Sequence, residues 1–366
     1  MPSSTFDFLV QGWDRAQQAL FESVVQPLAF GLGLGNLLED AYDATGWLLV
    51  GLVQIAVILV VFGALERWRP VEPLTDRRAV RTDVLYTLIH RLGLVRLGLF
   101  FSVGPLFDAL FGALRVHGVP TWQFDAWLAP AWPGVTNTAA FAFAAYLVVF
   151  DFVDYGLHRG QHGLRWWWAL HALHHSQRQM TRWSDNREHL LDDLIRDSVL
   201  VLVARAIGIA PGQFVAVVAC TQLLESLAHA NVRLSFGLLG ERLLVSPRFH
   251  RRHHAIGGGH ESAGPGTLGG HNFAVLFPLW DVLFRTANFE ARYEPTGIRD
   301  QLPEAGGRDY GRGFWSQQAL GLKRLGAALG RRTAGGESPG AAHGATAGMA
   351  PQAASGPPAG RVSSPR

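Results

Sequence analysis

The sequence predicts an all-α protein: a bundle of several membrane-spanning helices with a histidine-rich helical cap on its cytoplasmic side. Three observations support this fold class. The 366 residues are 48% hydrophobic and their mean hydropathy is positive, which exceeds the usual need of a soluble domain. Several apolar segments approach the roughly 20 residues that a spanning helix requires. Twelve of the 15 histidines lie between His158 and His271, beside those apolar segments.

Charge and cysteine content narrow the class of protein. The net charge of +3 comes from scattered arginines rather than from a basic stripe, so a nucleic-acid partner is not expected. Cys220 is the one cysteine, which excludes an internal disulfide, a thiolate zinc site and a cysteine-ligated iron–sulfur cluster. A protein-bound metal ion must therefore sit on His, Asp or Glu side chains.

The first 135 residues are predicted to hold an N-terminal amphipathic segment (1–45) and the first membrane spans (46–135). Charged residues such as Asp14 and Arg15 interrupt the N-terminal apolar pattern, so we expect no cleavable signal peptide. The clearest span is the charge-free segment 47–65. A second span is predicted within 84–114, although Arg91 and Arg96 interrupt its first half.

A histidine-rich domain is predicted over residues 136–290. A third span (136–152) leads directly to His158. The stretch 190–228 is broken near Gly208 and Pro211, which is typical of two shorter spans joined by a tight turn. Residues 291–326 are predicted to form a C-terminal extension. The tail 327–366 is rich in Gly, Ala, Pro and Ser and is expected to be disordered.

Loop arginines predict the orientation in the membrane, because short cytoplasmic loops are enriched in Lys and Arg. The loop after the first span carries five arginines, whereas residues 116–135 contain no Lys or Arg. The first loop is therefore predicted to be cytoplasmic. Counting spans from that loop places every clustered histidine on the same side.

Three histidine motifs indicate a metal site. They are HRGQH (His158, His162), HALHH (His171, His174, His175) and HRRHH (His250, His253, His254). On a helix, residues three or four apart share a face, so HRGQH can clamp one metal ion. In HALHH and HRRHH, histidines three or four apart can hold one ion while the adjacent histidine reaches a second ion. The repeated pattern favours two ions over a cluster of surface histidines.

Imidazole ligands leave the charge of two metal ions uncompensated, so carboxylates should gather nearby. Candidates near the motifs are Asp151, Asp154, Asp185, Glu188, Asp192, Asp193 and Glu225. Asp151, Asp154 and Glu225 are predicted to act behind the metal ligands, with direct ligation by Glu225 an open alternative. Spacing leaves the metal undecided among iron, zinc, copper and nickel.

The isolated histidines, three consecutive tryptophans and the cysteine are not assigned to the metal site. His90, His117 and His343 lie outside the cluster and are assigned no function. The tryptophans 166–168 are interpreted as interfacial anchors, with lining of a lipid entrance as the alternative, and Cys220 as a packing residue.

HRGQH, HALHHS, and SPRFHRRHH followed by NFAVLFPLWDVLFRT resemble the fatty acid hydroxylase and sterol desaturase superfamily of membrane di-iron enzymes, including bacterial members labelled sterol desaturase. The resemblance covers roughly residues 140–290. It implies two further histidine ligands, His189 in NREHL and His229 in LAHAN. Leu190 departs from the usual proline after the first of these, and His260 and His271 are additional histidines without an assigned role.

The resemblance implies a catalytic domain in which two iron ions, with zinc possible in the isolated protein, use dioxygen to hydroxylate or desaturate a lipid. Electrons would come from a separate reductase, ferredoxin or cytochrome. The lipid could be a fatty acyl chain, sterol, hopanoid, carotenoid or ether lipid. The expected location is the bacterial inner membrane.

Two other classes of function stay open. A membrane zinc enzyme could activate water to hydrolyse a lipid ester, and it would need neither oxygen nor reductant. A non-catalytic membrane metal-binding or transport protein would place polar residues along its spans, whereas this sequence gathers them at one face.

Overall fold

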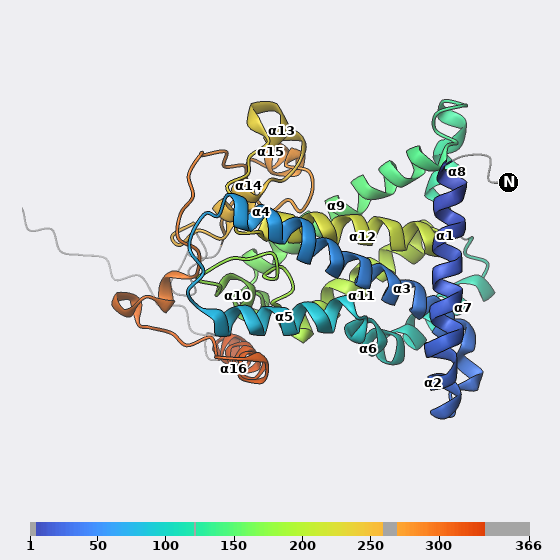
Figure 1. Ribbon diagram of the computed structural model, residues 1–366, viewed down its shortest axis with the longest axis horizontal. Helices are drawn as coiled ribbons and strands as arrows, with labels where there is room; N and C mark the ends of the chain where they lie inside the picture. The colour runs from blue at the N-terminus through green and yellow to red at the C-terminus, as the bar shows by residue number, and fades with distance from the viewer. Residues whose placement is uncertain (1–4, 121, 259–268, 334–366) are drawn as a thin grey trace, which may run out of the picture.

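The computed structural model describes residues 5–120, 122–258 and 269–333, and all statements below refer to this part of the chain. Helices dominate it. The only bridges outside helices are two isolated pairs, Pro70 with Val232 and Ala255 with Thr296. Helices α3, α5, α9 and α12 run along one general direction, and the short helices α13, α14 and α15 gather with loops at one end of the bundle (Figure 1). The predicted all-α class is confirmed.

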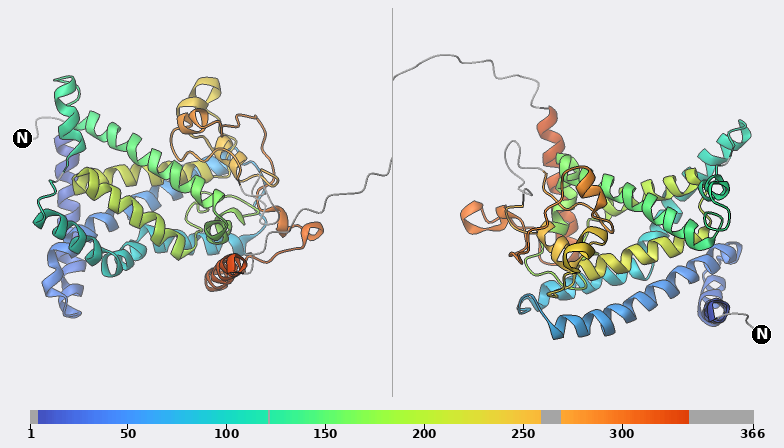
Figure 2. Two further views of the ribbon diagram at one scale, coloured as in Figure 1. Left: turned by 180° about the vertical axis from the view of Figure 1, so that it is seen from behind. Right: turned by 90° about the horizontal axis from the view of Figure 1, so that it is seen from above.

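The helices preceding the histidine motifs are α1 (Thr5–Leu20), α2 (Gln26–Gly31), α3 (Leu38–Val57), α4 (Gly63–Trp68), α5 (Arg77–Arg91), α6 (Leu94–Ser102), α7 (Gly104–Val116) and α8 (Phe124–Leu128). The helices that follow are α9 (Ala139–Gly163), α10 (Arg165–His175), α11 (Leu190–Ile207), α12 (Pro211–His229), α13 (Gly237–Leu243), α14 (Pro247–His253), α15 (Leu279–Leu283) and α16 (Phe314–Thr333). A π-helical segment, Ile58–Phe62, joins α3 to α4. Helix α1 lies across the end of the bundle opposite α13, α14 and α15 (Figures 1 and 2).

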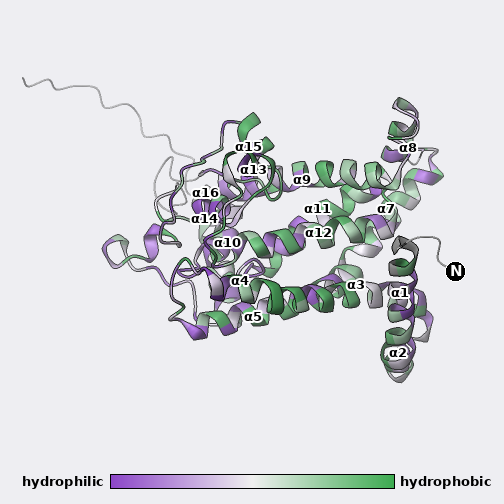
Figure 3. Cartoon of the chain, turned by 45° about the horizontal axis from the view of Figure 1, so that its top comes forward, coloured by the Kyte–Doolittle hydropathy of each residue, from purple (hydrophilic) through white to green (hydrophobic). Residues whose placement is uncertain are grey.

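Two helices are long and apolar enough to cross a membrane: the continuous helix Gly35–Trp68, and α9. The first contains the predicted span 47–65, and α9 begins at Ala139, three residues after the predicted start of the span 136–152, and includes the rest of it. Hydrophobic residues line the long helices and hydrophilic residues collect at the end with α10 and α14 (Figure 3). The chain is therefore membrane-associated through at least these two helices.

The second predicted span is broken. Helices α5 and α6 together are apolar enough to cross, but they meet at a bend of 48°. Gly93 lies at this bend with φ 83°, a left-handed conformation that glycine adopts at little cost. The next helix starts only at Gly104, so the stretch 84–114 is not one straight helix.

The stretch 190–228 does form two helices, α11 and α12, joined at Gly208. That residue has φ 69°, and a Cβ built on it would lie 2.1 Å from the carbonyl oxygen of Trp122, so the turn requires glycine. Among the described residues, neither helix is both long and apolar enough to count as a candidate span. The physical reason in α11 is its charged side chains, which include Asp192, Asp193 and Arg196.

Apolar contacts hold α9, α11 and α12 together beside the site. Tyr146 and Phe150 of α9 pack with Leu200 of α11 and Val217 of α12, all at most 8% exposed. Helix α16 packs along α10. It continues to Thr333, past the predicted start of the tail at residue 327; residues 334–366 lie outside the described part.

Candidate metal centre

Four helices present the clustered histidines. Helix α9 continues from its apolar segment into HRGQH, so His158 and His162 stand one turn apart. Helix α10 carries HALHH, and α12 ends at His229. Helix α14 starts at Pro247 behind the cap residue Ser246, whose hydroxyl accepts from the Phe249 amide, a favoured start for a helix. Where α14 starts determines which face of the helix carries the histidines of HRRHH.

The structure brings nine histidines together, and each is at most 8% exposed. The first histidine group is His158, His162, His171 and His175, and the second histidine group is His174, His229, His250 and His254. Within each group one ring nitrogen per residue lies within 4.8 Å of the others. His253 joins the two, because it forms an overlapping set with His175 and His254.

Ring nitrogens of the second group face one another at short distances. The Nε2 atom of His229 lies 3.1 Å from Nε2 of His174 and 3.0 Å from Nε2 of His250. The Nε2 atom of His254 lies 3.2 Å from that of His250. Imidazole nitrogens bound to one transition-metal ion at about 2.0–2.1 Å are separated by comparable distances. These residues therefore fit a metal ion.

The outer nitrogens of several rings are held by carbonyl oxygens. Nδ1 of His158 lies 2.8 Å from the Phe273 carbonyl oxygen, and Nδ1 of His253 lies 2.7 Å from that of His271. Nδ1 of His229 lies 2.8 Å from the Glu225 carbonyl oxygen. A carbonyl can only accept, so each Nδ1 carries the proton, and the Nε2 lone pair is left for a metal ion.

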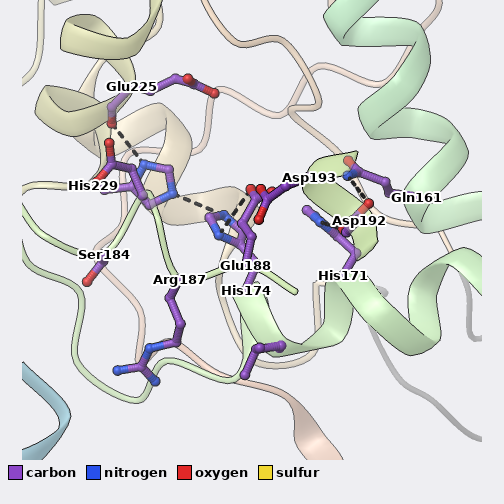
Figure 4. Close-up of polar contacts among 12 residues, drawn as sticks. Gln161, His171, His174, Ser184, Arg187, Glu188, Asp192, Asp193, Glu225 and His229 are labelled. Atoms are coloured by element: carbon purple, nitrogen blue, oxygen red, sulfur yellow. Dashed lines mark hydrogen bonds and ion pairs between the residues drawn. The ribbon is translucent and has the colours of Figure 1, made fainter. Parts of the chain in front are cut away.

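Carboxylates face two other rings from outside (Figure 4). Oδ2 of Asp192 lies 3.3 Å from Nδ1 of His171, while its Oδ1 accepts from Gln161 and Trp167. Oε1 of Glu188 lies 3.7 Å from Nδ1 of His174. Such carboxylates orient metal-bound imidazoles and raise their basicity.

The protonation of these rings suits metal binding. Burial and the neighbouring histidines hold the pKa of His174 and of His250 well below its usual range, and burial lowers the pKa of His229. These rings are neutral at pH 7, as metal ligands must be. Nε2 of His171 is buried and has no hydrogen-bond partner among the described residues, so it is open to an ion.

The three carboxylates predicted behind the ligands take different positions. Asp151 accepts from the amides of Leu276 and Phe277 and from the Trp280 indole, so it holds a loop. Asp154 and Glu225 line a cavity of about 30 Å³ beside histidines of both groups. Nη2 of Arg196 lies 2.9 Å from Oδ1 of Asp154 and 3.6 Å from Oε1 of Glu225.

His189 is not brought into either histidine group. Its Nδ1 accepts from the Leu191 amide, and its Nε2 lies 3.0 Å from the carbonyl oxygen of Gln318 in α16. The Leu190 amide donates to Oε1 of Gln318 at 2.9 Å. Proline has no amide hydrogen, so a proline at position 190 could not donate this bond. Leu190, which stands in its place, can.

Gln318 was missed by sequence reasoning, because it lies outside the motif region. Its Nε2 donates to the Tyr86 hydroxyl and to the Glu188 carbonyl oxygen. Gln318 therefore connects α16 and α5 to the segment that carries Glu188 and leads to Asp192. His271 contributes its carbonyl oxygen, and His260 and His343 lie outside the described residues.

The helices and histidines together define a membrane-associated helical protein with paired histidine metal-binding groups. Residues 143–286 match the model of the fatty acid hydroxylase family. The chain is 27% identical over 255 residues to ornithine lipid hydroxylase OlsE of Rhizobium tropici, covering 69% of this chain and 70% of that protein. No solved structure matches. The chain therefore resembles the fatty acid hydroxylase superfamily over residues 143–286, and both similarities support an enzyme that acts on lipid.

Proposed function

We propose that this protein is an integral-membrane di-iron oxidoreductase that uses dioxygen and external electrons to hydroxylate a lipid C–H bond. The observation that carries the proposal is the pair of buried histidine groups inside a fatty acid hydroxylase domain. Histidine-rich ligation alone is compatible with other metals, so the choice of iron rests on the family.

The proposed ligands divide between two ions. His158, His162, His171 and His175 would hold one ion and His174, His229, His250 and His254 the other. His253, whose ring lies 4.5 Å from that of His158, would complete the first set. His189 is left out of the ligand set, because both of its ring nitrogens already have hydrogen-bond partners.

Bound iron would supply the activation of dioxygen. The overall reaction converts R–H, O₂, two electrons and two protons into R–OH and water. The chain's own residues would hold the imidazoles in place through Asp192 and Glu188 and keep bulk water away, since the histidines are buried. A separate reductase, ferredoxin or cytochrome would supply the electrons.

The substrate is proposed to be a membrane lipid on the cytoplasmic side of a bacterial inner membrane. The side is inferred from the arginine-rich loop after Trp68. Because the relative's name specifies an ornithine lipid, an ornithine-containing lipid is the first substrate to test. Desaturation of the same lipid is the alternative outcome within the oxygenase class.

Isotope labelling tests the proposal. Detergent-purified protein loaded with ferrous iron would be given an ornithine-containing lipid, a reductant and ¹⁸O₂, and the product analysed by mass spectrometry. The proposal predicts a hydroxylated lipid carrying ¹⁸O from the gas. A zinc hydrolase would cleave the lipid without oxygen or reductant and take its oxygen from water. Metal binding without any turnover would instead support the non-catalytic alternative.

A further inference from the structure

The short helices α13 and α15 expose large apolar side chains. Six of them are half or more exposed, with fractions from 50% to 83%. These residues, here called the α13–α15 patch, are Leu238, Leu239, Leu243, Leu279, Val282 and Leu283. A contiguous exposed apolar surface marks a contact with a partner or a membrane.

The two helices lie beside each other at the edge of the helical bundle (Figures 1 and 3). The Val245 amide, just after α13, donates to the carbonyl oxygen of Leu276, just before α15, at 2.8 Å. This hydrogen bond joins the segment that follows α13 to the segment that precedes α15. The patch is therefore one surface rather than two separate ones.

The patch continues the apolar surface of the membrane-spanning helix α9. Phe152 of α9 is 45% exposed, and its ring centroid lies 4.8 Å from that of Trp280 and 6.3 Å from that of Phe284. Phe152 is the last residue of the third span predicted at 136–152, at the end of that span nearest the histidine motifs. Helix α15 therefore touches α9 at the end of the predicted span, where the bilayer interface is expected.

Arginines border the patch. Arg159 lies 5.8 Å from the Phe284 ring and Arg242 lies 4.9 Å from the Phe289 ring, and both arginines are exposed. Arg285, next to Phe284, is also exposed. Arginines of this kind lay their apolar stems on hydrophobic surface while the charge reaches the lipid phosphates. Exposed leucines with an arginine border fit the interface of a bilayer.

The patch is also connected to the metal centre. Helix α13 leads within a few residues to α14, which carries His250 and His253. In α15, the Asp281 carboxylate accepts from the amides of Phe273 and Ala274. The Phe273 carbonyl oxygen in turn faces Nδ1 of His158. A displacement of α13 or α15 would therefore shift a histidine that is proposed to bind metal.

We infer that the α13–α15 patch inserts into the bilayer and is where the membrane delivers its lipid to the metal centre. Insertion follows from the apolar surface, its contact with α9 and its arginine border. Delivery of a substrate rests in addition on the proposed function. The proposed partner of the patch is the lipid bilayer, not a second copy of the chain or an electron-transfer protein.

Site-directed spin labelling tests insertion. In a Cys220→Ser background, nitroxides would be attached at Leu239→Cys and Leu283→Cys, with exposed Glu304→Cys as the control, in nanodiscs of phosphatidylethanolamine and phosphatidylglycerol. If the patch is inserted, oxygen should relax the nitroxides at both patch sites more than a water-soluble nickel chelate does. At the control site the nickel chelate should relax the nitroxide more than oxygen does. Equal access of the nickel chelate to all three sites would overturn it. Shielding from both reagents, with spin–spin broadening for a second copy, would also overturn it.

Kinetics tests delivery. Leu239→Asp and Leu283→Asp should raise KM severalfold for a bilayer-embedded lipid and leave both kcat and bound metal unchanged. The matched control is Leu322→Asp at an exposed position of α16. An unchanged KM in the patch variants would overturn the delivery role. Absence of turnover in the wild-type protein would contradict the proposed function alone, since the spin-label result does not depend on activity.

Discussion

The imidazole of His189 lies directly against Gly321 of α16: a Cβ built on Gly321 would lie 2.2 Å from Cδ2 of His189. This contact is possible because glycine has no side chain. It brings the α16 backbone close enough for the Gln318 carbonyl oxygen to meet Nε2 of His189. A C-terminal helix outside the matched family region thus fixes the start of α11, where Asp192 faces His171.

Replacing Gly321 with alanine should destabilise the protein. The added methyl group must displace the His189 ring, and overpacking of this kind costs roughly 1–3 kcal/mol. Thermal unfolding in detergent should show a lower Tm. The matched control is Gly326→Ala on the same helix, where a Cβ meets nothing within 4 Å; there the Tm should stay or rise, since alanine favours a helix by about 0.5–1 kcal/mol. Equal effects of the two changes would contradict the close packing.

Gln318→Ala should weaken both stability and metal binding. The change leaves the Leu190 amide, the Tyr86 hydroxyl and the Glu188 carbonyl oxygen without their partner, and each unsatisfied buried group costs roughly 1–3 kcal/mol. Calorimetric unfolding and competition with a metal chelator would measure the two losses. Neighbouring Gln317, equally buried but bonded through its side-chain nitrogen to Gly311 at 3.3 Å, is the control. If Gln317→Ala lowers metal affinity as much, Gln318 has no special role.

Asp192→Asn should lower metal affinity without unfolding the protein. The carboxylate faces Nδ1 of His171, and loss of such a partner typically costs about 10–100-fold in metal affinity. Titration with Co²⁺, followed by its d–d absorption, measures the affinity. The control Asp300→Asn removes a carboxylate bonded to Tyr310 rather than to a clustered histidine, and it should leave the titration unchanged. Wild-type affinity in Asp192→Asn would refute the orienting role.

Gly51→Ala should disturb the packing of the first spanning helix against α5. A Cβ on Gly51 would lie 1.7 Å from the Arg91 carbonyl oxygen, so the helices must separate. Arg91 is bonded to Asp185 and Ser226, and its displacement would break a buried network. The Tm should fall by more than for Gly98→Ala, where nothing lies within 4 Å. A Tm equal to that of Gly98→Ala would show that the two helices can move apart freely.

Features that depend on local pattern could be predicted from the sequence. The charge-free segment 47–65 lies within the helix Gly35–Trp68, and the spacing of HRGQH placed His158 and His162 on one face of α9. The repeated spacing also favoured two metal ions, and the structure forms two histidine groups that could each hold one. These features follow from helical periodicity and hydropathy, which act within a few turns.

Features that depend on distant contacts could not be predicted. The carboxylate that faces His171 could have been any of several nearby acids, and it is Asp192 because α11 packs beside α10. His189 resembles a ligand by its local motif, yet Gln318, 129 residues later, bonds its ring. The break at Gly93 depends on a backbone conformation that hydropathy does not report.

The number of metal ions per chain tests the central claim most directly. Metal analysis of purified wild-type protein should give about two irons. His162→Ala, in the first histidine group, and His229→Ala, in the second, should each retain about one. His117→Ala, outside both groups, should retain two. Absence of metal in the wild-type protein, or the same metal content in all four proteins, would contradict the paired-ion centre.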